Sequence, residues 1–259
     1  MRQFAEQGSY HKHSVALRNP NQFYVALLQK LIPGLSKNAI NLSLSDGHVV
    51  NVQEFMTLYI YKEIFADRCY DVQIDCAEPQ ILDVGANTGL FALRMKQLFP
   101  AATVTCYEPF LPNFERLQKT IKSNQLERVS AVPKAVGKKQ GSAALYIHER
   151  NVGGHSFYPA QASSQKSVPV EVVDLDSVLD EFPHQVDLLK LDCEGAEFEI
   201  LMSSSQLANK VRQIMIEPSP RLYDIKELLG RMEALGFKRR WRNGLYHFWR
   251  ADGMTPGNA

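Results

Sequence analysis

The feature that most constrains this chain is the stretch ILDVGANTGLFAL, residues 81–93. An apolar run typical of a strand contains Asp83, and a turn with Gly85 and Gly89 leads into a pattern of helical period. Glycine allows the backbone to approach a neighbouring group closely, so two glycines in one strand-to-helix turn indicate a ligand site. From residue 80 onwards strand and helix patterns alternate, which predicts a doubly wound, Rossmann-like α/β sheet that is mostly parallel.

The last and the first parts of the chain add to this predicted sheet. The segment FKRRWRNGLYHFWRA reads as two strands joined at Asn243-Gly244, so we expect a terminal hairpin that contributes an antiparallel strand. The front section, residues 1–75, has no sheet large enough to stand alone, and we expect it to form an N-terminal cap on a main domain over residues 76–259. The elements expected in the cap are a helix over 21–32, a hairpin around Asp46-Gly47 and a helix over 53–66.

Further strands and helices are expected within the main domain. VSAVPKAVG predicts the third strand, and SAALYIHE and VPVEVVDL predict two additional strands around a Gly/Ser-rich loop. RLYDIKELLGRMEALG has the apolar spacing of an amphipathic helix, with Leu222 on its inner face and Gly236 as its C-terminal cap.

The composition narrows the classes of partner. The 259 residues carry a formal net charge of +1, so we expect neither a broad basic surface for nucleic acid nor attraction to an anionic membrane. No apolar run approaches the roughly 18 residues of a membrane span, and the N-terminal residues lack the apolar core of a signal peptide. The four cysteines show no CxxC spacing, which favours reduced thiols in a cytoplasmic protein.

The acid in the glycine turn indicates what kind of ligand fits. The spacing GxxxG differs from the GxGxxG fingerprint that binds a pyrophosphate, and Asp83 would repel a phosphate but attract an ammonium group. The second strand ends in Glu108, where a carboxylate can accept hydrogen bonds from two ribose hydroxyls. A ligand with a ribose, no phosphate and an ammonium-bearing tail fits S-adenosylmethionine. For Asp83 alone, the simpler alternative is a carboxylate that caps the following helix.

Several motifs carry a resemblance to a known family. VGANTGLFAL, CYEPFLPNFERL and LLKLDCEGAEFEIL together resemble the FkbM family of S-adenosylmethionine-dependent methyltransferases, as do the segments Lys134–Gly137, Gly154–Ser156 and Val172–Leu179. The resemblance covers roughly residues 60–220 and says little about the front section. It implies the class I methyltransferase fold with its terminal antiparallel hairpin, and in many members O-methylation of natural products and sugars.

The same resemblance implies a cofactor site. The glycine turn, the end of the second strand and the start of the next helix would line the S-adenosylmethionine site, and part of the third strand would pack near its adenine. The residues implied are Asp83, Gly85, Ala86, Asn87, Gly89, Glu108, Pro109, Asn113, Ala135, Val136 and Asp192.

The motif KLDCEGAE and the strand after it bring a second set of carboxylates to the same sheet edge. These are Asp192, Glu194, Glu197 and Glu217. Three interpretations stay open. The carboxylates orient the methionine ammonium group and the nucleophile, they bind a divalent cation such as Mg²⁺ through oxygen ligands, or they cap the helix and pair with Lys190. No particular metal ligands are assigned.

An alcohol is a poor nucleophile, so methyl transfer to it needs a group that removes the proton. His155, in the loop over 150–167, is the neutral candidate, since its usual pKa suits proton transfer near neutral pH. Asp192 and Glu194 are alternative bases, acting directly or through a bound cation. A surface histidine without a role is the simpler explanation for His155. We favour the metal-free route, because no compact signature such as HxxxD marks a metal site, and we expect the loop to be mobile and to close over the site.

The expected function is methylation of a hydroxyl on a small acceptor, namely a glycoside, a sugar or a polyketide. A homo-oligomer is compatible with this expectation. One alternative is an N-methyltransferase of a small amine or peptide, and another is a non-catalytic nucleotide-binding protein, against which the intact Asp83, Glu108 and Asp192 argue. An RNA methyltransferase would use the basic segment KRRWR, but a solvated edge strand explains that segment more simply.

Overall fold

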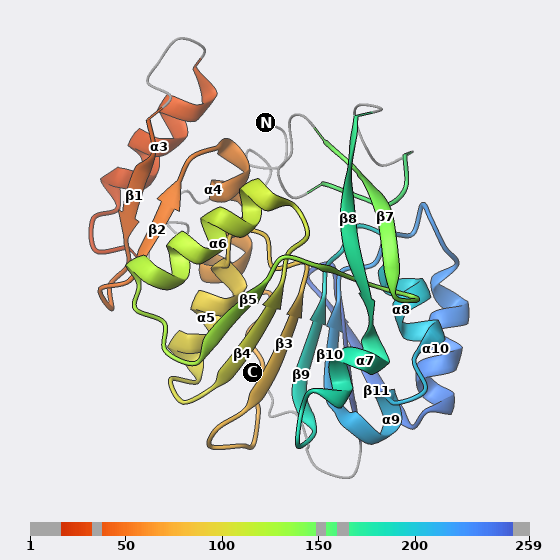
Figure 1. Cartoon of the computed structure of the whole chain (residues 1–259). Coiled ribbons are helices and arrows are strands. Elements are labelled where there is room, and N and C mark those ends of the chain that lie inside the picture. Colours follow the sequence, from red (N-terminus) through yellow and green to blue (C-terminus); the bar gives the residue numbers. More distant parts are fainter. Residues whose placement is uncertain (1–16, 33–37, 149–153, 160–165, 251–259) are drawn as a thin grey trace. The chain divides into compact units, whose positions relative to one another are not determined.

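The computed structural model describes residues 17–32, 38–148, 154–159 and 166–250 (Figure 1). The chain divides into two compact units, Met1–Asp71 and Val72–Ala259. Within the described residues, no helix has both the length and the apolar character that crossing a membrane requires.

The first unit contains the two helices and the antiparallel hairpin that the sequence predicts. Phe23, Leu42, Val50 and Leu58 are fully buried and form its core together with Tyr61, whose ring stacks on Phe65 with centroids 5.3 Å apart. The elements are α3 (Asn21–Leu31), β1 (Ile40–Ser43), β2 (Val49–Val52), α4 (Phe55–Tyr61) and a π-helical turn, η1 (Lys62–Ala66).

The second unit is built on a seven-stranded sheet in the order β11-β12-β10-β9-β3-β4-β5. Neighbouring strands from β10 to β5 run parallel, and β12 lies antiparallel between β10 and β11. The predicted doubly wound sheet with a terminal antiparallel hairpin is therefore confirmed. The strands are β3 (Gln80–Val84), β4 (Thr103–Tyr107), β5 (Val129–Val132), β9 (Val186–Leu191), β10 (Val211–Ile216), β11 (Phe237–Arg242) and β12 (Leu245–Arg250).

The central strands are apolar on both faces, so helices cover both (Figure 1). Every residue of β9 is buried, as expected of a strand in the middle of a parallel sheet. Leu82 and Leu189 belong to the core cluster that faces α7, α8 and α10, while the opposite face brings Lys190 over the ring of Phe91 in α5. The helices are α5 (Leu90–Leu98), α6 (Leu111–Ser123), α7 (Leu175–Asp180), α8 (Glu197–Ser203), α9 (Leu207–Lys210) and α10 (Ile225–Ala234).

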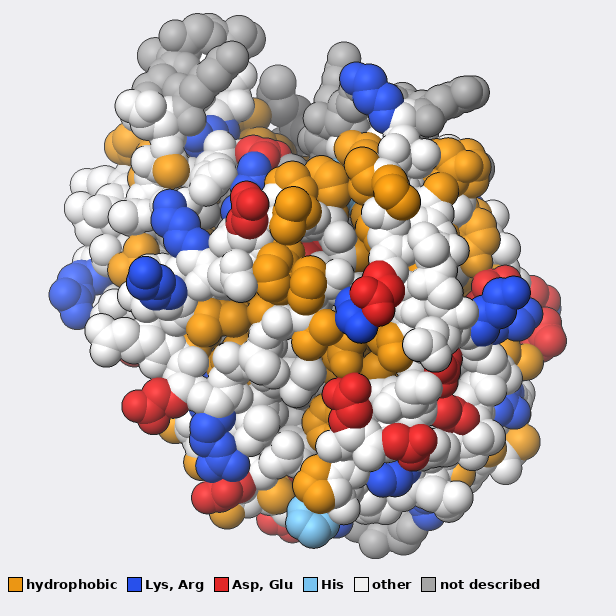
Figure 2. Space-filling model, viewed as in Figure 1, with side chains coloured by type: hydrophobic (Ala, Val, Ile, Leu, Met, Phe, Trp, Pro, Cys, Tyr) orange, Lys and Arg blue, Asp and Glu red, His pale blue; other side chains and the backbone are white. Residues whose placement is uncertain are grey.

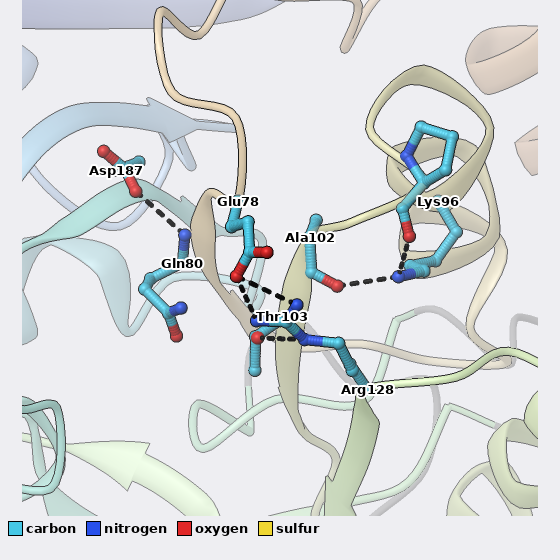
Figure 3. A network of polar contacts seen from close by, with 8 residues as sticks. Glu78, Gln80, Lys96, Ala102, Thr103, Arg128 and Asp187 are labelled. Carbon is cyan, nitrogen blue, oxygen red and sulfur yellow. Dashed lines mark hydrogen bonds and ion pairs between the residues drawn. The ribbon is translucent and has the colours of Figure 1, made fainter.

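Side chains clamp the sheet at the amino ends of its strands (Figure 3). The Arg128 guanidinium donates two hydrogen bonds of 3.1 Å to Glu78 Oε2 and one of 3.1 Å to Thr103 Oγ1. Lys96 Nζ donates to the Ala102 carbonyl at 2.7 Å, which holds the turn between α5 and β4. These contacts lie at the end of the sheet away from the glycine turn, because the turn follows the carboxyl end of β3.

A second, three-stranded sheet has the order β6-β8-β7, with β6 (Ala135–Gly137), β7 (Gly141–Tyr146) and β8 (Ser167–Asp174). The two additional strands expected from the sequence are confirmed as β7 and β8. The prediction of one continuous third strand over VSAVPKAVG is wrong, because β5 ends at Val132 and β6 joins the other sheet. Pro133 separates the two strands and has no N–H to donate to a ladder.

Two helices differ from the expectation. The helix predicted from residue 221 begins only at Ile225, because the Asp224 side chain accepts a hydrogen bond of 2.9 Å from the Lys226 backbone N–H. Helix α7 directly follows β8 and was not expected. It begins there because Asp174 Oδ1 accepts from the Ser177 N–H at 2.9 Å.

The face shown in Figure 2 carries Lys and Arg side chains interspersed with Asp and Glu, and hydrophobic side chains lie between them. Among the residues drawn on that face, no broad area is covered by positive charge alone. This distribution agrees with the net charge of +1.

Candidate active site

The turns that follow β3, β4 and β9 lie side by side at the carboxyl edge of the sheet. The N–H groups of Gly85 and Ala86 both donate to the Tyr107 carbonyl at 3.0 Å, and the Asp192 N–H donates to the Val84 carbonyl at 3.2 Å. These backbone bonds bring the glycine turn, the Glu108 turn and the acidic turn after β9 together, as the sequence predicts for the ends of parallel strands.

The two glycines of the first turn are required by their backbone angles and by the protein around them. Gly85 has φ 78°, and a Cβ there would lie 1.9 Å from the Asp192 carbonyl oxygen. Gly89 has φ 83° at the N-terminus of α5, and a Cβ there would lie 2.6 Å from Leu117 Cδ1. The sequence suggested that Gly85 makes room for a ligand. The neighbour that requires the glycine is the backbone of the acidic turn.

The Glu108 carboxylate is buried and held by two backbone donors. The Asn87 N–H donates to Oε2 at 2.8 Å and the Phe110 N–H donates to Oε1 at 2.9 Å. Burial raises the pKa of Glu108 to about 7, although the two N–H groups and Lys190 act in the opposite direction. Each carboxylate oxygen keeps a further lone pair, so Glu108 can accept two more hydrogen bonds from adjacent hydroxyls.

Asp83 forms a buried ion pair with Lys190. Asp83 is fully buried, and its Oδ1 lies 3.1 Å from Lys190 Nζ because the two residues face each other in the β3–β9 register. Burial raises the pKa of Asp83, and the Lys190 ammonium opposes this increase. Within the part of the chain that the structure describes, Asp83 Oδ2 has no hydrogen-bond partner. A capping role for Asp83 is not seen, since its contacts go to Lys190 and not to the start of α5.

The acidic turn contains carboxylates of two kinds. Glu197 is fully buried, and its carboxylate accepts from the N–H groups of Cys193 at 2.8 Å and of Gly195 at 3.0 Å. Glu197 thus stabilises the turn that precedes α8, whereas the helix itself has no side-chain cap, so the capping role that the sequence left open is not seen. Asp192 and Glu194 are half-buried instead. Burial, with the Asp192 and Glu197 charges, raises the pKa of Glu194 to about 8.

His155 packs beside the Glu108 turn. Its ring lies on Phe110 with centroids 4.2 Å apart, and its Nδ1 accepts a hydrogen bond of 3.1 Å from the His148 N–H. The proton of the neutral ring therefore sits on Nε2, which is buried and, among the described residues, has no partner. Burial, followed by the effects of His148 and Arg116, lowers the pKa of His155 to about 4.

The loop that carries His155 is joined to the acidic turn. Ser156 Oγ donates to the Glu194 carbonyl at 2.6 Å, and the Tyr158 N–H donates to Ser156 Oγ at 3.1 Å. Residues 154–159 are described and docked in this way, whereas much of the lid expected over 150–167 lies outside the described residues. The predicted catalytic residues His155, Asp192 and Glu194 thus lie on segments that contact each other or the Glu108 turn.

The remaining predicted cofactor residues lie on the same turns or on β6. Asn87 has φ 49° in the glycine turn, and Asn113 is buried in the first turn of α6. Ala86 follows Gly85, Pro109 follows Glu108, and Ala135 and Val136 are buried on β6. Sequence reasoning missed Phe110, for which its position directly after the YEP motif was the available signal. It also missed the packing of Leu222, whose Cδ1 lies 2.1 Å from where a Cβ on Gly195 would be.

Across the described ranges, no cluster of three or more His, Cys, Asp or Glu side chains has a geometry that could hold a metal ion.

These features define a class of protein. A doubly wound sheet with one antiparallel strand near its edge carries a buried carboxylate at the end of the second strand, and beside it a glycine turn joined to an acidic turn. In doubly wound α/β folds, ligands bind at this edge, beyond the carboxyl ends of the strands.

Comparison with known proteins identifies the family. The model of the methyltransferase FkbM domain matches residues 83–239. Methyltransferase 1 of Beauveria bassiana is 32% identical over 55% of this chain and 65% of its own length, and methyltransferase sdnD of Sordaria araneosa is 30% identical over 61% and 73%. The 31-O-demethyl-FK506 methyltransferase FkbM of Streptomyces tacrolimicus is 26% identical over 72% of this chain and 82% of its own length. The chain belongs to the FkbM family of methyltransferases, as its motifs predict, and it spans just under two thirds of Methyltransferase 1.

Proposed function

We propose that this protein is an S-adenosylmethionine-dependent O-methyltransferase that acts on a hydroxyl of a small natural product or sugar. The observation that carries the proposal is the Glu108 carboxylate, buried and oriented by the Asn87 and Phe110 N–H groups with lone pairs left for two hydroxyls. Membership of the methyltransferase family supports methyl transfer. The similarity to the 31-O-demethyl-FK506 methyltransferase of Streptomyces tacrolimicus supports oxygen as the acceptor atom.

The residues present fit this cofactor. Glu108 suits a ribose diol, and the acidic surroundings of Gly85 suit an ammonium group. A buried carboxylate with unfilled acceptor positions costs free energy, because it has lost its hydrogen bonds to water. The two hydroxyls of a diol supply the missing donors to Glu108. Ala135 and Val136 offer a buried apolar surface on β6 for a planar ring. S-Adenosylmethionine supplies a methyl group on a sulfonium, so the protein needs to align the acceptor and remove its proton.

Among the candidate bases, the contacts favour Glu194. With a pKa of about 8, the Glu194 carboxylate accepts a proton close to neutral pH, where a general base is most effective. His155 stays a candidate, but its Nδ1 already accepts from the His148 N–H, and a ring with a pKa of about 4 is a weak base. We infer that His155 instead presents its Nε2–H as a donor, and that Asp192 keeps the proton affinity of Glu194 high by its charge.

The class of acceptor that we propose is a hydroxyl of a glycoside, a sugar or a polyketide. Proton removal through Mg²⁺ bound by Asp192, Glu194 or Glu217 is the alternative route. We also propose a cytoplasmic location, which the four cysteines support, since none of them is in a disulfide. Cys106 is buried and Cys193 is half-buried, and the pKa of each thiol is raised mainly by burial.

A two-step experiment tests this function. Calorimetric titration with S-adenosylhomocysteine first establishes cofactor binding, and a mass-spectrometric screen of hydroxylated and glycosylated natural products then detects methyl uptake, with chelator and with Mg²⁺. Cofactor binding together with a product methylated on oxygen supports the proposal. Absence of cofactor binding overturns it, and a product methylated on nitrogen changes the class of acceptor. Activity that is lost with chelator and restored by Mg²⁺ indicates the metal route.

A further inference from the structure

We propose that Lys190 is a positioning residue for the cofactor's amino-acid end, and that Asp192, not Asp83, is the carboxylate that meets its ammonium group. This inference rests on the proposed function and concerns the same site. It assigns to the buried Asp83 an indirect role, exerted through Lys190.

The Lys190 ammonium has three partners, one on β3 and one in each of the two turns that follow β3 and β9. Nζ donates a hydrogen bond to the Gly85 carbonyl at 2.7 Å, and it forms ion pairs with Asp83 Oδ1 at 3.1 Å and with Asp192 Oδ2 at 3.5 Å. Lys190 is 4% exposed, so its ammonium group is not open to a ligand that arrives from solvent.

The exposures of the two carboxylates separate their roles. The Asp83 side chain is 0% exposed, whereas the Asp192 side chain is 32% exposed. A cation that arrives from solvent can therefore reach Asp192 but not Asp83. Asp83 compensates the buried charge of Lys190, because a buried ammonium without a partner would be strongly unfavourable.

The backbone adds a second constraint to the same group. A Cβ on Gly85 would lie 1.9 Å from the Asp192 carbonyl oxygen, and the Asp192 N–H donates to the Val84 carbonyl at 3.2 Å. The glycine turn and the acidic turn are thus in direct contact, and Lys190 bridges their polar groups on the ligand side. Burial alone would lower the pKa of Lys190, but the Asp83 and Asp192 carboxylates raise it overall, so the bridge is charged at neutral pH.

The net charge around Lys190 then suits an ammonium ligand. Two carboxylates and one ammonium leave one negative charge, and Asp192 is the exposed member. Loss of Lys190 would release Asp192 and the Gly85 carbonyl, and it would leave Asp83 without a counter-charge. The ribose subsite at Glu108 uses different donors, the Asn87 and Phe110 N–H groups, and would stay intact.

Two ligands separate these subsites. S-Adenosylhomocysteine carries the ammonium group, whereas 5′-methylthioadenosine has the same nucleoside and lacks the amino-acid end. Isothermal titration calorimetry measures the affinities of both ligands for the full-length wild type and for K190M, D192N and D83N/K190M. The double variant removes both buried charges, so it keeps the test possible if K190M does not fold.

We expect D192N to bind S-adenosylhomocysteine about 10- to 100-fold more weakly, because the ammonium group loses a charge-assisted contact. K190M and D83N/K190M should lose a similar factor for a different reason, because Asp192 and the Gly85 carbonyl lose the group that positions them. Affinity for 5′-methylthioadenosine should stay within about twofold in each case, because the nucleoside contacts are unchanged. D83N/K190M should also melt above K190M, since it leaves no uncompensated buried carboxylate.

Other outcomes overturn the inference or its basis. An equal loss of affinity for both ligands would make Lys190 a purely structural residue, and unchanged affinity for both would remove it from the site. If D192N has wild-type affinity for S-adenosylhomocysteine, Asp192 is not the carboxylate that binds the ammonium group. If the wild type binds neither ligand, the proposed function itself fails, and that result is distinct from a failure confined to the variants.

Discussion

At the scale of single residues, the carboxyl edge of the sheet combines groups whose ionisation is set by burial. Glu108, Glu194 and Glu197 have pKa values raised to about 7, 8 and 7, with burial as the largest cause in each case. Their hydrogen bonds distinguish them. Glu108 and Glu197 accept backbone N–H groups, whereas the Glu194 side chain accepts no hydrogen bond from the residues that the structure describes. One edge of the sheet thus holds a carboxylate proposed to bind ribose, a structural carboxylate and a candidate base.

Replacing Glu108 tests the ribose subsite. We expect Glu108→Ala to weaken S-adenosylhomocysteine binding by about 1–3 kcal/mol, because two hydroxyls lose a charged acceptor. Calorimetry measures the change. Glu115→Ala is the matched control, since Glu115 is an exposed carboxylate on α6, the helix that follows Glu108, and its loss should leave affinity unaltered. Wild-type affinity in Glu108→Ala would refute the assignment.

Replacing Glu194 tests the base. A base acts in its deprotonated form, so the wild-type turnover should rise as pH increases through the Glu194 pKa of about 8. Glu194→Gln should lower kcat by about 10²–10⁴-fold and abolish that rise, with little change in cofactor affinity. Glu199→Gln is the control, because Glu199 is an exposed carboxylate in the first turn of α8. A full rate in Glu194→Gln together with a large loss in His155→Ala would make the histidine the base.

At the scale of elements, the sequence predicted what depends on strand and helix period and missed what depends on tertiary contact. The alternation from residue 80 predicted the sheet, and the position of Glu108 after a strand predicted its place at the ligand edge, because parallel strands end together. It could not predict that the Asp192 carbonyl is the reason for Gly85, or that three partners converge on Lys190. Those facts require the register between β3 and β9. Pro133 indicates the break after β5 in the sequence itself, because proline has no N–H to donate to a strand ladder.

The glycine turn should be intolerant of a side chain. Gly85→Ala places a Cβ 1.9 Å from the Asp192 carbonyl oxygen at a φ of 78°, so the two turns must separate. We expect a lower melting temperature and a loss of at least about 1–3 kcal/mol in the free energy of unfolding. Gly230→Ala is the matched control, because nothing lies within 4 Å of its would-be Cβ inside α10 and alanine favours the helix. Equal stability of both variants would contradict the close contact.

At the scale of the whole second unit, a buried histidine joins separate parts of the chain. His247 on β12 contacts Gln213 Oε1 on β10 through Nε2 at 2.8 Å, and Gln213 Nε2 donates to the Gln73 carbonyl at 2.9 Å. This chain of contacts ties the antiparallel strand and the entry to the unit onto the parallel sheet. Burial, followed by the effect of Arg240, lowers the pKa of His247 to about 4.

The stability of the protein should therefore respond to acid through His247. The unfolded chain binds a proton below about pH 6.5 while the folded chain resists it down to about pH 4, so the contribution of His247 is fully present above 6.5 and is lost as pH falls between these values. The loss approaches about 3 kcal/mol. Denaturant unfolding at several pH values gives the free energy of unfolding of the wild type and of His247→Gln. The difference between the two proteins isolates the effect of His247, because the opposite effect of the buried glutamates is present in both.

His184→Gln is the control for this measurement, because His184 is exposed. The control should follow the wild type at every pH, whereas His247→Gln should lose less stability on acidification. If the wild type and His247→Gln lose the same free energy of unfolding between neutral and acidic pH, His247 is not the group that the acid protonates.

The clamp formed by Arg128, Glu78, Thr103 and Lys96 has a consequence for how such a protein can diverge. It holds the strands at the end where no chemistry takes place, so the order and spacing of the strands do not depend on the loops at the other end. Substitutions and insertions in the loop around His155 can then alter which molecule is accepted without loosening the scaffold. In a library randomised at each end of the sheet, we expect folded variants with new acceptors to arise from the carboxyl-edge loops and not from the clamp.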